Sequence, residues 1–224
     1  MDAKMLLVFA AMSALLIASE SALTYDFYDR TCPSFSKIVM DTVISKQIAT
    51  PTTAAATIRV FLHDCLLTGC DASVLLASTT FHSAERDADI NHSLSGDAFD
   101  LVTRAKTALE LSCPLTVSCA DILAEATRNL VSMAGGPYYK VLLGRLDSRY
   151  SSASSVEGHL PRSAMALSQI TKIFQVSQIH LFNNVDFQPR PLPRRSKDSP
   201  FRKWWLSPAP TQLGSLIAAN STPI

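Results

Sequence analysis

Apolar residues recur every three to four positions through most of the first 175 residues, the spacing of helices with one buried face. The first such segment follows Pro33-Ser34, carries Phe35, Val39 and Val43, and stops at Pro51. Residues 139–143 are short and apolar and are expected to be extended. The predicted fold class is all-α. The remaining helices are expected at residues 53–65, at residues 97–111, from the Ser118 cap to the Gly135-Gly136-Pro137 stop, and from near Ser163 through Leu167, Ile170 and Phe174.

The N-terminus has a different pattern. Residues 5–17 are an almost unbroken apolar run behind Lys4, followed by small residues. This run is too short for a membrane span, which needs about 20 residues, but it suits the core of a secretory signal peptide. We expect residues 1–22 to be that peptide and the mature chain to be soluble, extracellular and free of the membrane. A buried N-terminal helix is the alternative.

Composition and charge exclude several classes of protein. Of the 224 residues, 47% are hydrophobic and 17% are charged, which excludes an intrinsically disordered chain. Twenty Lys and Arg against nineteen Asp and Glu leave a net charge of +1, so no nucleic-acid partner is expected. Residues 66–96 form a long polar connection, and loops of that length are usually functional or tied down.

The C-terminal part departs from these averages. Residues 188–210 contain six of the twelve Pro, six Lys or Arg against one Asp, and both Trp. Such a density of proline prevents helix and central strand alike. We therefore expect a helical domain at residues 23–175 and a divergent, disordered Pro- and Arg-rich tail at residues 176–224. Alternatively, the tail is a basic, Trp-bearing arm for an acidic partner, which would make the protein a secreted binding module.

Arg59 and His63 are the first candidates for chemistry. They lie four positions apart on the second predicted helix and therefore project from one face. A neutral imidazole beside a guanidinium suits a reaction that moves a proton while negative charge develops on an oxygen. A solvated helix face is the simpler alternative for such a pair.

The segment that follows His63 carries oxygen donors on a short loop. Cys65 and Cys70 are close enough in sequence to close that loop, and the side chains of Asp64, Asp71 and Ser73 surround it. Hard oxygen donors on a tight loop are what a calcium ion requires. A plain disulfide-closed turn is the alternative.

Taken together, these segments resemble the secretory plant haem peroxidases (class III). The resemblance runs from about Tyr25 to Phe174 and follows the family's order. It is carried by Cys32-Pro33, Arg59-x-x-x-His63-Asp64-Cys65, Gly69-Cys70-Asp71-Ala72-Ser73-Val74-Leu75-Leu76, Val117-Ser118-Cys119-Ala120-Asp121-Ile122-Leu123, Gly135-Gly136-Pro137, Leu143-Gly144-Arg145-x-Asp147 and Leu160-Pro161.

The resemblance implies a fold, an activity and a location. The fold would be the distal, N-terminal half of the haem-peroxidase fold. The activity would be that of an oxidoreductase with haem b and calcium, which reduces hydrogen peroxide with small phenolic donors, as in peroxide removal under oxidative stress or wall-phenol oxidation. The protein would be a monomer in the cell wall or apoplast.

The resemblance also implies roles around the imidazole. His63 would be the distal acid–base residue, Arg59 would stabilise charge on the departing oxygen, and Asn91 and Glu85 would support the imidazole. Asn91-His92-Ser93 is formally a glycosylation sequon, so Asn91 should be buried and unmodified if it serves His63. Pro161 matches the residue at the edge where aromatic reductants dock.

Further implied features are structural. Asp121 and Arg145 would form a buried ion pair. The five cysteines would give the disulfides Cys32–Cys113 and Cys65–Cys70 and leave Cys119 without a partner. Calcium would be bound by the side chains of Asp64, Asp71 and Ser73 and the carbonyls of Leu67 and Gly69, with Glu85 linked nearby.

Three departures from the family's pattern change the expectation. Leu62 stands where the family usually has an aromatic residue, and Ser163 replaces a proline. After Phe174 the sequence contains no Leu-Ser-Gly-Ala-His segment, so no proximal haem ligand is found, and His180 is only a weak substitute. The alternative expectation is therefore a truncated or frame-altered chain that is catalytically inactive, because haem needs an axial ligand.

Overall fold

Helices carry almost all of the regular structure, as the apolar spacing predicts. The computed structural model describes residues 23–67, 69–176 and 185–186. In this part of the chain the α-helices are α2 (Phe35–Ala49), α3 (Thr53–Leu67), α4 (Gly96–Ser112), α5 (Cys119–Met133) and α6 (Leu167–Val176). The all-α fold class is confirmed. The expected signal peptide, His180 and nearly all of the expected tail lie outside the described residues.

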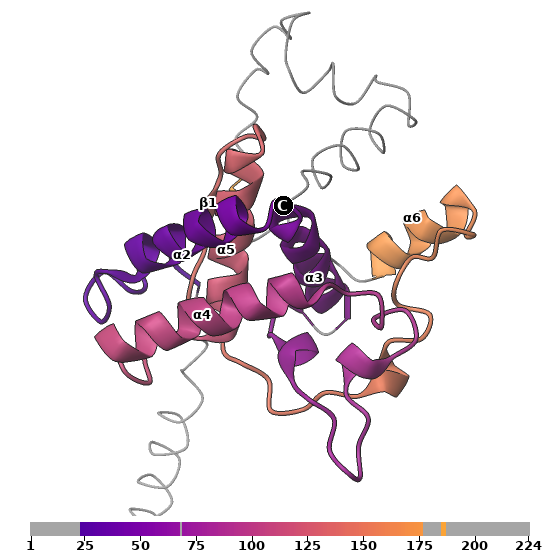
Figure 1. Ribbon diagram of the computed structural model, residues 1–224. Helices are drawn as coiled ribbons and strands as arrows, with labels where there is room; N and C mark the ends of the chain where they lie inside the picture. Colours follow the sequence, from indigo (N-terminus) through magenta and orange to yellow (C-terminus); the bar gives the residue numbers. More distant parts are fainter. Residues whose placement is uncertain (1–22, 68, 177–184, 187–224) are drawn as a thin grey trace, which may run out of the picture. The chain divides into compact units, whose positions relative to one another are not determined.

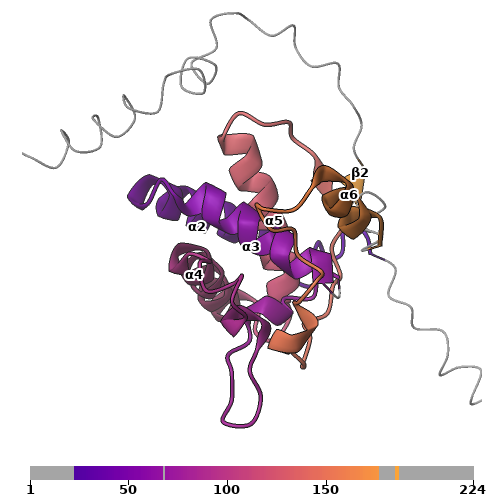
Figure 2. The ribbon, with the colours of Figure 1, turned by 90° about the vertical axis from the view of Figure 1, so that its right-hand side faces the viewer.

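The core lies between four of these helices. α3 packs against α4 and α5, and α2 packs against the same two helices. Figures 1 and 2 show α2 and α4 side by side, with α5 crossing them. The side chains that fill the space between them are fully buried, among them Val43, Val60, Leu101, Leu109 and Leu123. Val43, Leu109 and Leu123 are positions that the apolar spacing assigns to a buried face.

The long connection between α3 and α4 is held against the helices. It contains two 3₁₀ turns, η1 (Ser73–Leu75) and η2 (Glu85–Asp87), and a third, η3 (Ala153–Ser155), packs against η2. A small second apolar cluster secures this region, formed by Leu66, Ala88, Val156 and Leu160. The connection is therefore tied down, which brings residues 85–93 to the end of α3.

Two elements differ from expectation. The last helix was predicted to start near Ser163 but begins at Leu167, because a turn closed by the Met165 N–H on the Arg162 carbonyl occupies the preceding residues. Strand β1 (Lys140–Val141) confirms the predicted extended segment. It pairs antiparallel with β2 (Val185–Asp186), which lies inside the expected tail, in the register Lys140↔Asp186 and Val141↔Val185. Among the described residues, no helix is long and apolar enough to span a membrane.

Candidate active site

α3 presents Arg59 and His63 on one face, as their spacing predicts. The opposite face, which includes Val60 and Asp64, is buried in the core, so the pair is oriented outward by the packing of the helix. Both side chains are partly buried. The Arg59 Nε–H donates to His63 Nε2 over 3.5 Å, a long and weak bond that leaves the imidazole available to another partner.

A cavity of about 360 Å³ lies beside this pair. Its wall is apolar except for Arg59 and His63, and Leu62, which is 37% exposed, forms part of it. A mostly apolar cavity with few convergent polar groups is the usual form of a small-molecule site. Pro161, the residue expected at the edge of the site, lines the same cavity as Arg59 and His63. The lining residues are Ala55, Ile58, Arg59, Leu62, His63, Leu66, Pro161 and Phe174.

A chain of hydrogen bonds sets which imidazole nitrogen carries the proton. Asn91 Nδ2 donates to the Glu85 carbonyl over 2.7 Å, so its Oδ1 is turned to His63 Nδ1, 2.6 Å away. Nδ1–H must then donate to that oxygen, and Nε2 keeps its lone pair. Asn91 is 2% exposed, so the burial expected of it is observed. Glu85 joins this chain through its backbone carbonyl; its carboxylate instead accepts from Ser73 Oγ over 2.9 Å.

Burial is the largest cause that lowers the pKa of His63 below its ordinary value. The hydrogen bond to Asn91 opposes this shift, and the charge of Arg59 adds to it. A lowered pKa keeps the imidazole neutral near pH 7, in the form that can accept a proton.

The guanidinium of Arg59 is anchored to the same connection. Its Nη1 donates to the Ser93 carbonyl over 3.0 Å, and its Nη2 donates to Ser93 Oγ over 2.8 Å and to the Ile90 carbonyl over 3.3 Å. Sequence reasoning missed Ser93 and Ile90 as partners of Arg59. Their closeness in sequence to Asn91 was the only available signal.

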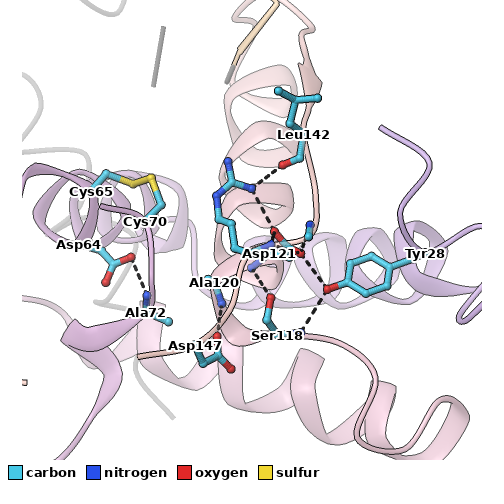
Figure 3. Close-up of polar contacts among 12 residues, drawn as sticks. Tyr28, Asp64, Cys65, Cys70, Ala72, Ser118, Ala120, Asp121, Leu142 and Asp147 are labelled. Carbon is cyan, nitrogen blue, oxygen red and sulfur yellow. Dashed lines mark hydrogen bonds and ion pairs between the residues drawn. A yellow bond between two sulfur atoms is a disulfide. The ribbon is translucent and has the colours of Figure 1, made fainter. Parts of the chain in front are cut away.

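The predicted calcium ligands gather around the short disulfide loop. Cys65 and Cys70 are bonded (Figure 3), and Asp64, which precedes Cys65 on α3, is fully buried. Asp64 accepts the N–H of Ala72 over 2.9 Å and that of Val74 over 3.3 Å. The pKa of Asp64 is raised to about 7: burial is the largest cause, the charges of Asp71 and Glu85 add to it, and the two N–H bonds oppose it.

The residues in this loop fit a calcium ion by their chemistry. A divalent cation would favour the ionised form of Asp64, which burial and then the charges of Asp71 and Glu85 disfavour. In the part of the chain that the structure describes, no three His, Cys, Asp or Glu side chains are arranged to hold a metal. The ion would therefore need hydroxyl and carbonyl oxygens as well, such as those of Ser73, Leu67 and Gly69.

Other expected features are present outside the cavity. The second disulfide joins Cys32 and Cys113, with 5.6 Å between the Cα atoms. Cys119 is a free thiol, and burial is the main cause that raises its pKa to about 11. The ion pair between Arg145 Nη1 and Asp121 Oδ1 spans 3.0 Å, and Asp121 is fully buried.

The Asp121 carboxylate joins three segments of the chain. Its Oδ2 accepts from the Tyr28 hydroxyl over 2.8 Å and from the Gly144 N–H over 2.7 Å, in addition to its contacts with Arg145 (Figure 3). The buried charge is thus paired and hydrogen-bonded, as a buried carboxylate must be. Burial, followed by the charge of Asp121, raises the pKa of Tyr28 to about 12.

Comparison with known proteins gives a consistent result. The model of the family described as "Peroxidase" matches residues 39–184. Peroxidase 41 of Arabidopsis thaliana is 60% identical over 153 residues, which are 68% of this chain and 47% of that protein. Peroxidase 65 and Peroxidase 63 of the same plant are each 55% identical, over 74% and 76% of this chain and 50% and 52% of their own lengths. The chain spans about half the length of the curated relatives it matches.

Proposed function

Because this chain belongs to the plant peroxidase family, we propose that its helical domain supplies the peroxide-activating side of a haem peroxidase that oxidises small phenolic donors. One observation carries the proposal. His63 and Arg59 face an apolar cavity, and the bond to Asn91 leaves Nε2 of the imidazole as the basic nitrogen. This arrangement provides a proton acceptor beside a fixed positive charge at a mostly apolar wall.

The cavity wall fits one face of a flat, apolar macrocycle. Ile58, Leu62 and Leu66 would contact its surface, and Pro161 would lie near its edge, where a phenol could approach. A bound haem would supply the redox centre that removes two electrons from the donors, one at a time, for each peroxide consumed. Leu62 would leave more room at this wall than the aromatic residue usual in the family.

The side chains would move the protons of the reaction. His63 Nε2 would accept a proton from one peroxide oxygen and return it to the other, so that the departing oxygen leaves as water. The positive charge of Arg59 would stabilise the negative charge that develops on that oxygen as the O–O bond breaks. The weak bond from Arg59 Nε to His63 Nε2 would give way to the peroxide proton.

We also propose calcium binding and secretion. Asp64, Asp71 and Ser73 would hold calcium beside the Cys65–Cys70 disulfide, in the segment that directly follows His63. The ion would stiffen the end of α3 that carries the imidazole. Two disulfides in a small domain are typical of an oxidising, extracellular compartment.

The test is to refold the full chain oxidatively with haem and calcium and to record its visible absorption spectrum before and after hydrogen peroxide. We expect a Soret band that shifts with peroxide. In His63→Ala the band should remain while the rate of the shift falls by about 10²–10⁴-fold. His82→Ala changes an exposed histidine outside the cavity and is the matched control. It should react as the unmodified chain does.

A spectrum no different from free haem would overturn the proposal for this chain. It would favour a second candidate, a protein that keeps the distal side without binding haem by itself. One observation supports that candidate: among the described residues the other histidines, His82, His92 and His159, are exposed, and none lines the cavity. Haem iron needs an axial protein ligand.

A further inference from the structure

A four-residue segment, Ile90 to Ser93, contacts both members of the α3 pair. Asn91 Oδ1 holds His63 Nδ1, and the carbonyls of Ile90 and Ser93 accept from Arg59. The segment therefore fixes the imidazole and the guanidinium relative to each other, although it lies 28 to 34 residues away in sequence.

Ser93 contributes the only side-chain contact that the structure records between this segment and Arg59. Its hydroxyl accepts from Arg59 Nη2 over 2.8 Å, the shortest of the bonds to the guanidinium. The same hydroxyl has a longer contact of 3.4 Å with the Ile90 carbonyl. Ser93 is exposed and Arg59 is half-buried, so water competes for this short hydrogen bond. When the bond forms, it favours one rotamer of the long, flexible Arg59 side chain.

We propose that Ser93 is a positioning residue for Arg59: its hydroxyl keeps the guanidinium beside Nε2 of His63, where charge would develop on the departing oxygen. This inference rests on the proposed function for its catalytic consequence. Its structural content, that the hydroxyl of Ser93 determines where Arg59 lies, can be tested without haem or peroxide.

The first test compares Ser93→Ala with the unmodified full chain by NMR, in the absence of haem. The Arg59 Nε–H signal, assigned by its loss in Arg59→Lys, should exchange with water severalfold faster in Ser93→Ala. The pKa of His63 should rise towards its ordinary value, because a less localised Arg59 charge lowers it less. Ser93→Thr, which keeps the hydroxyl, should restore both values.

Ser95→Ala is the matched control. Ser95 lies two residues further along and caps α4 by accepting the Asp97 N–H. Its loss should lower the midpoint of thermal unfolding without changing the Arg59 exchange rate or the His63 pKa. Unchanged Arg59 exchange and His63 pKa in Ser93→Ala would overturn the inference, as would equal changes in Ser95→Ala, since these would indicate a general loosening of the connection.

A second test applies once peroxide reactivity of the unmodified chain has been measured. Ser93→Ala should then react with peroxide about tenfold more slowly, and Ser93→Thr should recover most of the rate. A full rate in Ser93→Ala would overturn the catalytic part of the inference. If the unmodified chain itself is unreactive, the proposed function fails, and the NMR comparison still decides whether Ser93 positions Arg59.

Discussion

His63 depends on the amide of Asn91 for its reactive form. The amide is oriented by its bond to the Glu85 carbonyl, so it can only accept from Nδ1. The imidazole, in turn, can only present Nε2 to the cavity. A single side chain thus sets the proton position on a residue 28 positions away.

Substitutions of Asn91 should shift the pKa of His63 in opposite directions. Asn91→Ala removes the bond that raises this pKa and should lower it, whereas Asn91→Asp places a negatively charged carboxylate beside Nδ1–H and should raise it. Asn91→Ala should also reduce the free energy of unfolding by about 1–3 kcal/mol, because buried polar groups lose their partner. NMR titration of the His63 ring and urea unfolding measure the two effects. A rise of the pKa in both variants would indicate exposure of the imidazole and contradict this account.

The start of α5 is held by two acceptors from different parts of the chain. Ser118 Oγ accepts the Asp121 N–H over 3.2 Å, as expected for the residue that the sequence marks as a cap. The Asp147 carboxylate, from the loop after β1, accepts the N–H group of Ala120 over 2.9 Å (Figure 3). It also accepts the N–H group of Cys119 over 2.9 Å. α5 is therefore bound to that loop at the end of the helix where backbone donors are free.

Asp147→Ala should destabilise the protein more than Ser118→Ala. The carboxylate accepts two bonds and carries a negative charge at the positive end of the helix dipole, so its loss should cost about 1–2 kcal/mol, against about 1 kcal/mol for Ser118. Urea unfolding measures both values. Ser154→Ala, at an exposed serine in η3, should stay within about 0.5 kcal/mol of the unmodified chain. If Ser118→Ala and Asp147→Ala lose equal free energies of unfolding, the charge of Asp147 does not stabilise the start of α5.

Calcium should make the stability of the whole domain less dependent on pH. The pKa of Asp64 is raised from 3.8 to about 7, so its stabilising contribution is complete below about pH 4 and is lost as the pH rises through about 7. Calcium favours the ionised form and should reverse that loss. At 100 times its dissociation constant it should add about 2.7 kcal/mol.

The measurement is thermal unfolding with calcium or with a chelator, at pH 5 and pH 8. The gain from calcium should be larger at pH 8. The lowered pKa of His63 has the opposite effect on stability, because the stability that it contributes is lost as the pH falls below about 6.5. This contribution is the same with calcium and with the chelator, so it cancels when the two unfolding temperatures are subtracted. Asp71→Asn should reduce the gain, and Asp89→Asn, at an exposed residue of the same connection, should not. If calcium raises the unfolding temperature of the unmodified chain, Asp71→Asn and Asp89→Asn by the same amount, this loop is not the calcium site.

The two disulfides should differ in what they stabilise. Cys32–Cys113 spans 81 residues and joins the start of α2 to the end of α4, whereas Cys65–Cys70 spans five. On the chain-entropy model, removing the long bridge by paired Cys→Ser substitution should cost about 4–5 kcal/mol and removing the short one about 2 kcal/mol. Urea unfolding measures the costs. Only the Cys65–Cys70 bridge should be needed for calcium to raise the stability of the protein. If calcium still stabilises the variant that lacks this bridge, the two disulfides do not differ in this way.

Much of this protein follows from its sequence alone. Helical spacing and caps located α2 to α5 to within a few residues, and the i, i+4 spacing placed Arg59 and His63 on one face. The family resemblance also pointed to Asn91 and Pro161, which the structure places against His63 and at its cavity, whereas calcium binding by the short disulfide loop stays a prediction. These features depend on short-range geometry or on a recurring pattern of residues, and both are visible without knowledge of the fold.

The tertiary structure decided the rest. It brought Ser93 to Arg59, turned the carbonyl of Glu85 instead of its carboxylate to Asn91, paired β1 with β2, and delayed the start of α6 to Leu167. The contact of Ser93 and the pairing of β1 with β2 depend on loops that fold back over 20 or more residues, and the role of Glu85 depends on a side chain that binds a backbone carbonyl. The late start of α6 comes from a local backbone turn between Arg162 and Met165. Apolar periodicity carries no information about any of these hydrogen bonds, because it reports only which face of an element is buried.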